Sequence, residues 1–180
     1  MKSDDEIRRM SVYRRGARDG AWMGLVLCGL FASWALSMRS PLASVAFMVL
    51  ALAVPVLACM QLRRSFRIDM GMSTLSALWM QGICTFFFGT LLMAALALVW
   101  LRWWQPGLIQ DSLLQAADVY AGIDNPDARR MAADVHTLID KGMVPRPVDV
   151  ALSLLWGGVF SGSILSLVCG AVLRATGAKK

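Results

Sequence analysis

Four long apolar stretches constrain the fold of this chain more than any other feature. They run roughly over residues 19–38, 42–62, 74–101 and 150–173, and none carries a charge in its middle. About twenty mostly apolar residues are needed to cross the hydrocarbon core of a bilayer as a helix. Lipid cannot satisfy open backbone N–H and C=O groups, so each stretch is expected to be helical. We therefore expect an all-α, polytopic membrane protein with four transmembrane helices.

The overall composition agrees with this interpretation. Of the 180 residues, 57% are hydrophobic. A soluble domain of this length would interleave polar residues with its apolar positions. Here the apolar residues come in blocks instead, which excludes an ordinary soluble domain.

The basic residues are distributed in a way that predicts the topology. The net charge is +6, and its positive members gather before the first stretch, between the second and third, and after the fourth. The short loop between the first two stretches has only Arg39. Cytoplasmic loops of membrane proteins are enriched in Lys and Arg. We expect both termini in the cytoplasm, and we do not expect a nucleic-acid partner.

The chain then divides into five segments. Residues 1–18 form a basic cytoplasmic tail, 19–103 hold transmembrane helices one to three, and 104–149 form an extracytoplasmic helical hairpin. Residues 150–174 form transmembrane helix four, and 175–180 a second cytoplasmic tail. The hairpin is expected either to fold over the outer mouth of the bundle or to lie on the membrane surface.

Apolar spacing predicts the two helices of that hairpin. In the first, one face holds Ile109, Leu113, Ala116 or Ala117, and Tyr120. In the second, Asn125 is expected to cap the helix, Pro126 to take its first position and Lys141-Gly142 to end it. The apolar stripe of the second helix is predicted to be Ala128, Met131, Val135 and Leu138.

Aromatic residues mark the outer end of the third span. Trp100, Trp103 and Trp104 lie there with Arg102 among them. Tryptophan gathers at membrane–water interfaces, and an arginine at a helix end extends toward the headgroups. We interpret all four as interface anchors. The alternative for Arg102 is a site for an anionic substrate.

No catalytic, cofactor or metal site is predicted. The cysteines Cys28, Cys59, Cys84 and Cys169 all fall within the spans and show no CxxC spacing, so they are expected to be small packing residues. The lone His136 shares the hairpin with seven aspartates, but no loop has calcium-binding spacing, and we expect a solvated surface. The spans lack the charged residues of an ion path, with Gln81 and hydroxyls supplying polarity in the third.

Small residues recur every fourth position in the first and last spans. The first ladder is Gly16, Gly20 and Gly24, continued by Cys28 and Ala32, and the second is Gly158, Gly162, Ser166 and Gly170. In lipid, helices associate by close backbone contact, which small residues permit. These residues are predicted to pack helices together: spans one and four against each other, or each against another protein.

The order of these features resembles a known family. An arginine-rich loop leads into RSFRIDMGMSTLSALWMQG, a Trp-rich span end and a helical pair follow, and the chain closes with SGSILSLVCGAVLRATGAKK. This pattern, with the opening ARDGAWMGL, is similar to the bacterial membrane proteins grouped as domain of unknown function 4199. The resemblance implies a four-span bacterial membrane protein and supplies no activity and no catalytic residues.

The sequence favours a non-enzymatic accessory or interaction subunit of the bacterial inner membrane, without cofactors. Its expected partners are the lipid bilayer and either another membrane protein or further copies in a homo-oligomer. The alternative is an oligomeric carrier or channel-like protein for a lipid or small amphiphile, with the small-residue faces as a lateral groove. An intramembrane enzyme is the third possibility.

Overall fold

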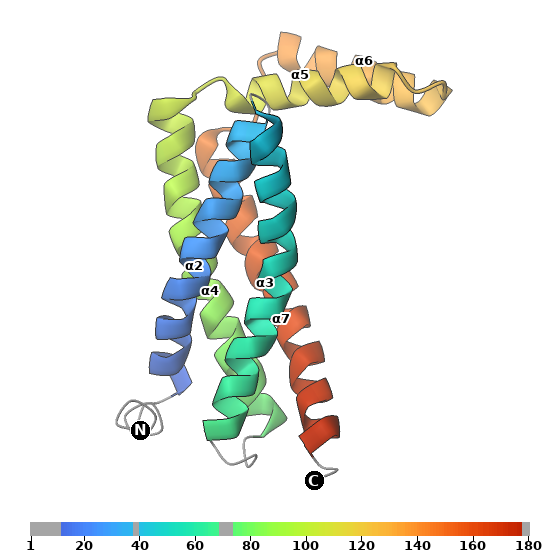
Figure 1. The fold of residues 1–180 in the computed structure, drawn as a ribbon. Helices are drawn as coiled ribbons and strands as arrows, with labels where there is room; N and C mark the ends of the chain where they lie inside the picture. Colours follow the sequence, from blue (N-terminus) through green and yellow to red (C-terminus); the bar gives the residue numbers. More distant parts are fainter. Residues whose placement is uncertain (1–11, 38–39, 69–73, 178–180) are drawn as a thin grey trace. The chain divides into compact units, whose positions relative to one another are not determined.

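The computed structural model describes residues 12–37, 40–68 and 74–177, and within them every regular element is a helix (Figure 1). The expected terminal tails and Arg39 lie largely or wholly outside these residues. The helices are α2 (Val12–Ser37), α3 (Pro41–Ile68), α4 (Leu75–Val99), the π-helical η1 (Trp100–Trp104), α5 (Leu108–Ala121), α6 (Pro126–Asp140) and α7 (Pro147–Gly177).

Four helices are long and apolar enough to cross a membrane. These spans are Tyr13–Ser37, Pro41–Arg67, Leu75–Trp104 and Pro147–Thr176. The predicted all-α class with four apolar spanning helices is therefore confirmed. Contacts divide the chain into two compact units: Met1–Leu96 with Leu152–Lys180, here called the membrane unit, and Ala97–Ala151, here called the connecting unit.

Several helix ends follow from local sequence. Pro41 opens α3, where its missing N–H costs little. The hydroxyl of Thr74 accepts a hydrogen bond from the backbone N–H of Ala77 at 3.2 Å and so caps the start of α4. The side chain of Asn125 caps α6 in front of Pro126, as predicted. Gly142 follows α6 with a φ of 66°, the left-handed conformation that favours glycine.

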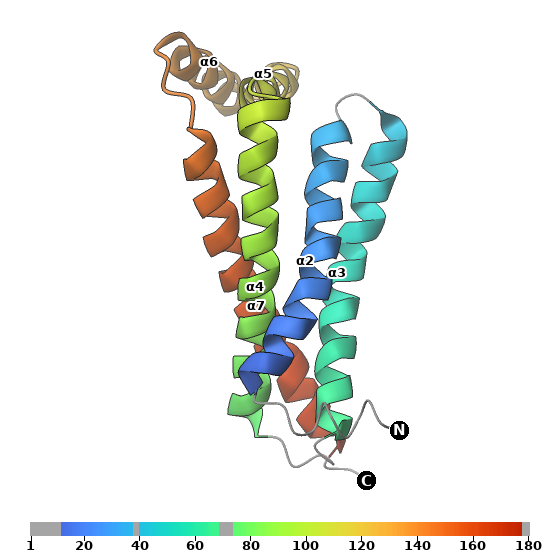
Figure 2. The same ribbon diagram turned by 90° about the vertical axis from the view of Figure 1, so that its left-hand side faces the viewer.

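α4 is the central helix of the membrane unit. In its most apolar 18-residue stretch 44% of the residues are buried, against 6% for α3. α2 contributes a buried face at four-residue spacing, Met23, Leu27, Phe31 and Ala35. In two views, α3 runs beside α2, and α7 runs beside α4 (Figures 1 and 2). α3 is thus a peripheral helix although it is strongly apolar, as lipid-facing helices are.

A disulfide joins α3 to α7. Cys59 and Cys169 are bonded across 110 residues of sequence, with their Cα atoms 5.7 Å apart. The expectation that all four cysteines are simple packing residues is therefore wrong for this pair, while Cys28 and Cys84 remain free thiols. Leu62 and Leu78 are buried against the bond. Spacing could not show the pairing, because it depends on which helices pack together.

The connecting unit begins with stacked tryptophans. The rings of Trp100 and Trp104 stack with centroids 4.8 Å apart, and the indole N–H of Trp100 donates to Gln105 Oε1 at 3.0 Å. Trp103 and Trp104 are each 73% exposed, as interface residues would be. Gln105–Gly107 then separate η1 from α5.

α5 and α6 pack together along small residues. Ala117 of α5 and Ala128 and Ala132 of α6 are buried, with Val135 and Ile139 half-buried. The predicted stripe is therefore wrong in two members, since Met131 and Leu138 are exposed. The centre of the contact face lies about 70–90° around α6 from Met131 and Leu138, given 100° per residue. Alanine is favoured there because it lets two short helices approach closely.

Candidate functional site

Both small-residue ladders lie against α4. On α2, a Cβ added to Gly16 would meet Cys84 at 2.5 Å, and one on Gly20 would meet Phe88 at 2.8 Å. One on Gly24 would meet Leu92 at 2.7 Å. Each step of four residues along α2 is matched by a step of four in the same direction along α4. The two helices therefore run parallel, as the first and third of four successive spans must.

The α7 ladder meets α4 in the opposite direction. A Cβ on Gly158 would collide with Thr90, one on Gly162 with Phe86, and Ser166 fills the space beside Gly82. Gly170 continues the series beside Leu75 and Leu78. A hydrogen bond from Trp79 Nε1 to Ser163 Oγ at 3.0 Å adds to this contact. α7 is thus antiparallel to α4 and in register with it.

The structure thus gives each ladder its own partner surface on the same helix. The atoms nearest to the ladder glycines of α2 belong to α4, and so do those nearest to the ladder glycines of α7. The ladders are not each other's nearest neighbours, which was the first of the two arrangements expected. The backbones of α2 and α4 also approach each other closely: a Cβ on Gly89 would lie 3.3 Å from both the carbonyl oxygen of Gly20 and the backbone nitrogen of Gly24.

A polar cluster joins α2, α3 and α4. Gln81 Nε2 donates to Ser65 Oγ at 2.6 Å and to Asp19 Oδ2 at 3.2 Å. Gln61 Nε2 donates to the backbone carbonyl of Asp19 at 3.2 Å. Asp19, Gln61 and Ser65 lie within about two turns of the arginine-rich ends of α2 and α3, and Gln81 lies in the second turn of α4. The cluster therefore fixes how α2 and α3 are rotated against α4.

Arginines surround the carboxylate of this cluster. Arg64, Arg18 and Arg15 lie within electrostatic range of Asp19, and Arg15 is itself buried. A carboxylate that enters a helix bundle is stabilised when it is paired and hydrogen-bonded. Asp19 therefore links α2 to α4 through the hydrogen bond that it accepts from Gln81.

A small cavity adjoins the cluster. Its volume is about 10 Å³, and Gln61, Gln81, Thr85 and Ser166 are among its lining residues. The hydroxyls of Thr85 and Ser166 donate to backbone carbonyls of their own helices, at 2.9 and 2.7 Å. Gln61 Oε1 is buried without a hydrogen-bond partner among the described residues. A space of this size admits about one water molecule, which Gln61 could bind, and it excludes any larger ligand.

Sequence reasoning missed this cluster, although a signal for it was present. Arg15 and Asp19, Gln61 and Ser65, and Gln81 and Thr85 are three polar pairs at four-residue spacing. Each pair lies on one face of its helix. Three such pairs near the same expected membrane boundary indicate convergence, but Asp19 was counted only as the edge of an apolar stretch.

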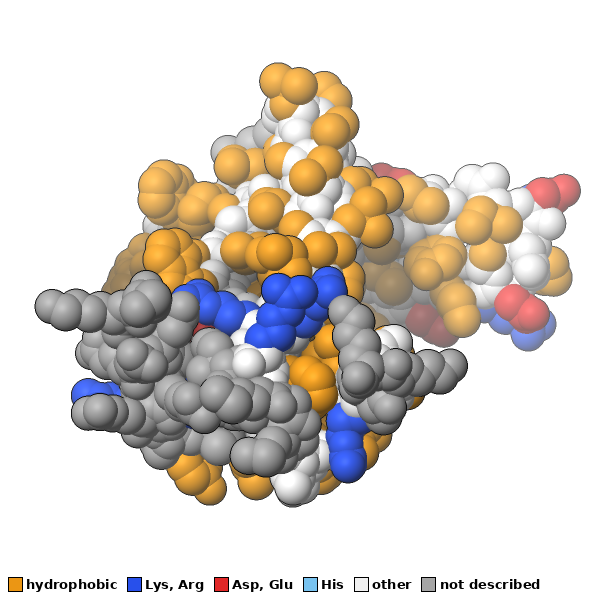
Figure 3. Space-filling model, turned by 60° about the horizontal axis from the view of Figure 1, so that its bottom comes forward, with side chains coloured by type: hydrophobic (Ala, Val, Ile, Leu, Met, Phe, Trp, Pro, Cys, Tyr) orange, Lys and Arg blue, Asp and Glu red, His pale blue; other side chains and the backbone are white. Residues whose placement is uncertain are grey.

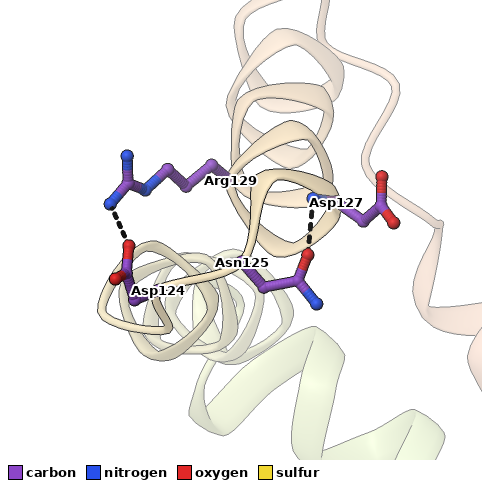
Figure 4. A network of polar contacts seen from close by, with 4 residues as sticks. All are labelled: Asp124, Asn125, Asp127 and Arg129. Atoms are coloured by element: carbon purple, nitrogen blue, oxygen red, sulfur yellow. Dashed lines mark hydrogen bonds and ion pairs between the residues drawn. The ribbon is translucent and has the colours of Figure 1, made fainter.

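The polar residues of the α5–α6 pair do not converge on a ligand. Asp124 pairs with Arg129 at 2.8 Å, and Asn125 accepts from the backbone of Asp127 (Figure 4). His136 is exposed, as is Arg102 of η1. Within the described ranges, no three His, Cys, Asp or Glu residues are grouped so that they could hold a metal ion.

The comparisons with known proteins gave one finding. Residues 19–175 match the family model described as "Protein of unknown function (DUF4199)". This confirms the family resemblance seen in the sequence. No curated protein and no solved structure matches the chain.

The ladder contacts predict which glycines tolerate a methyl group. Gly20→Ala should lower the free energy of unfolding by about 1–3 kcal/mol, because the new Cβ meets the Thr85 carbonyl oxygen at 2.8 Å. The matched control is Gly157→Ala on α7, where nothing lies within 4 Å of the new atom. That variant should be neutral or stabilised by up to about 1 kcal/mol.

Thermal unfolding followed by circular dichroism, in one detergent for all variants, makes the comparison. Equal stability of the two variants would show that the α2 ladder is not a packing face.

Proposed function

This chain belongs to the DUF4199 family of proteins of unknown function, and we propose that it is a non-enzymatic accessory or interaction subunit of the bacterial inner membrane. In this proposal it binds another membrane protein, or further copies of itself, through helix faces that its own fold leaves open. Both termini are cytoplasmic, and the α5–α6 pair is extracytoplasmic.

The two-faced character of α7 carries the proposal. Its small residues are covered by α4, whereas the residues between them form a ridge at four-residue spacing that is 51–71% exposed: Trp156, Phe160, Ile164, Val168 and Val172. α3 presents a similar ridge of Val45, Val49, Leu52, Val56 and Met60. Such ridges of large side chains are available to lipid and to the ridges and grooves of another helix.

The carrier alternative loses its main support. A lateral groove for an amphiphile would need the small-residue faces to be open, and α4 side chains occupy them. The polar cavity beside Gln61 has room for about one water molecule only. An association role requires neither a groove nor a cavity, and it leaves the exposed ridges as the contact surface.

Charge supports the proposed orientation. Exposed arginines gather at one end of the membrane unit, where α2 starts and where α3 and α7 end (Figure 3). They are Arg14, Arg18, Arg63, Arg64, Arg67 and Arg174. By the positive-inside rule this end faces the cytoplasm, which puts the Trp-rich end of α4 and η1 at the outer face.

The orientation predicts the outcome of reporter fusions. A reporter fused after residue 67 should be active only as a cytoplasmic reporter, and one fused after residue 125 only as an extracytoplasmic one. The paired use of a phosphatase and a fluorescent protein at each position provides the control. Reversed labelling at both positions would overturn the topology.

The association role predicts protein cross-links from the α7 ridge. A photoreactive phenylalanine at Phe160, which is 71% exposed, should give a protein adduct of higher mass when cells bearing native levels of the protein are irradiated. The matched control is Phe86, which is 4% exposed and should give cross-links only within the chain. Mass spectrometry identifies the adduct. Adducts at Phe160 and at Val56 that contain only lipid would contradict the proposal.

A further inference from the structure

We propose that the α5–α6 pair binds the surface of the bilayer, with one of its two flanks inserted at the boundary between lipid headgroups and acyl chains. This inference depends on the membrane location of the chain and not on the partner role proposed above. It concerns a surface of the connecting unit that packing within the pair leaves uncovered.

The pair has an apolar flank. With 100° per residue, Ile109, Leu113, Ala116 and Tyr120 lie on one side of the α5 contact face, and Met131 and Leu138 lie beside the contact face of α6. α5 and α6 pack against each other and are joined by four residues, Gly122–Asn125, so they run antiparallel. In an antiparallel pair these two sets project to the same side. We call these six residues the apolar flank.

The other side of the pair is charged. The same rotation places Asp111 and Asp118 of α5 together with Arg129, His136 and Asp140 of α6 on the opposite flank, and all five are exposed. The division between an apolar and a charged side is therefore clear on α5. Such a division is typical of helices that lie in the plane of a membrane interface, with the apolar side buried about 5–10 Å deep. On α6, the exposed Asp127 and Asp134 border Met131 and Leu138, so only the edge of this helix can reach the headgroup boundary.

Half of the apolar flank is exposed and the other half is partly covered. Tyr120 is 41% exposed, Met131 57% and Leu138 47%, while Ile109, Leu113 and Ala116 are half-buried. Tyrosine is favoured at an interface because its ring is apolar and its hydroxyl reaches water. Aspartates on the opposite flank would remain hydrated in the same orientation.

The bilayer is favoured as the occupant because the chain holds the pair close to it. Three residues, Gln105–Gly107, link η1 to α5, so α5 begins within roughly 14 Å of the exposed Trp104. Trp103 and Trp104 mark the membrane boundary. At its other end, residues 141–146 link α6 to α7, which is itself a candidate span. An apolar flank tethered at both ends to a membrane boundary has lipid as its nearest apolar surface.

Fluorescence quenching in vesicles tests this inference. Leu138→Cys places a label on the apolar flank, and its neighbour Thr137→Cys places one away from it. Both are made in a Cys28→Ala, Cys84→Ala background that keeps the Cys59–Cys169 bond. Each purified full-length variant is labelled with an environment-sensitive fluorophore and placed in phosphatidylcholine vesicles that carry a lipid quencher near the headgroup. Met131→Cys on the apolar flank and Arg130→Cys away from it repeat the comparison, one helical turn or more from residues 137 and 138.

The label at positions 138 and 131 should be quenched by the lipid quencher. It should also be several-fold less sensitive to aqueous iodide than the label at 137 and 130. Equal iodide quenching at 138 and 137 would overturn the inference, because the flank would then face water. A label at 138 that is shielded from both quenchers would also overturn it, because protein would then cover the flank. Failure of the partner proposal would leave these results unchanged.

Discussion

The close approach of α4 to two faces of small residues is the contact on which the membrane unit depends. Lipid gives helices no hydrophobic reason to associate, so the attraction must come from van der Waals contact over a large, well-fitted area. Glycine and serine at every fourth position remove the side chains that would keep the backbones apart. α2 uses this device from one side in a parallel direction, and α7 uses it in an antiparallel direction. α3 packs against α2, is hydrogen-bonded to α4 through Gln81 and Ser65, and is joined to α7 by the disulfide between Cys59 and Cys169.

Much of this architecture could be predicted from the sequence. Apolar length alone gives the four spans, because the bilayer sets the minimum length of a spanning helix. Local chemistry gives the ends of α6, where Asn125 and Pro126 leave few alternatives. The ladder residues also stand out, because glycine is costly in a helix unless something approaches closely. These features depend on short-range sequence or on the solvent, and so a single chain reveals them.

The remaining features depend on which helices pack together, and this pairing cannot be deduced from a single sequence. The sequence shows both ladders, but it does not show that both of them pack against α4. Asp19 looked like the polar edge of a span until Gln81 and Ser65 were brought beside it. Cys59 and Cys169 are 110 residues apart and show no motif. In α6, Met131 and Leu138 looked like core residues because periodicity finds an apolar side of a helix, but not which part of it the neighbour covers.

The packing also narrows what the protein can do. α4 covers the small-residue faces of α2 and α7. The surfaces that stay exposed are the large-residue ridges of α3 and α7 and the flanks of the α5–α6 pair. These are the surfaces that the proposed association would use, and the polar cluster holds α2, α3 and α4 together.

Rescue of a glycine substitution by a smaller side chain on α4 tests the central contact most directly. Gly162→Ala places a methyl group against the ring and the Cβ of Phe86. Phe86→Ala removes the ring and keeps the Cβ, so it should rescue Gly162→Ala in part, and each single change should destabilise the protein. If α4 receives the α7 ladder in the register described, the double variant should be more stable than the sum of the two losses, by about 0.5–3 kcal/mol. Phe86→Ala should give no such rescue of Gly20→Ala, whose new atom meets Thr85 and Phe88 instead. Additive losses for Gly162→Ala and Phe86→Ala would contradict the account.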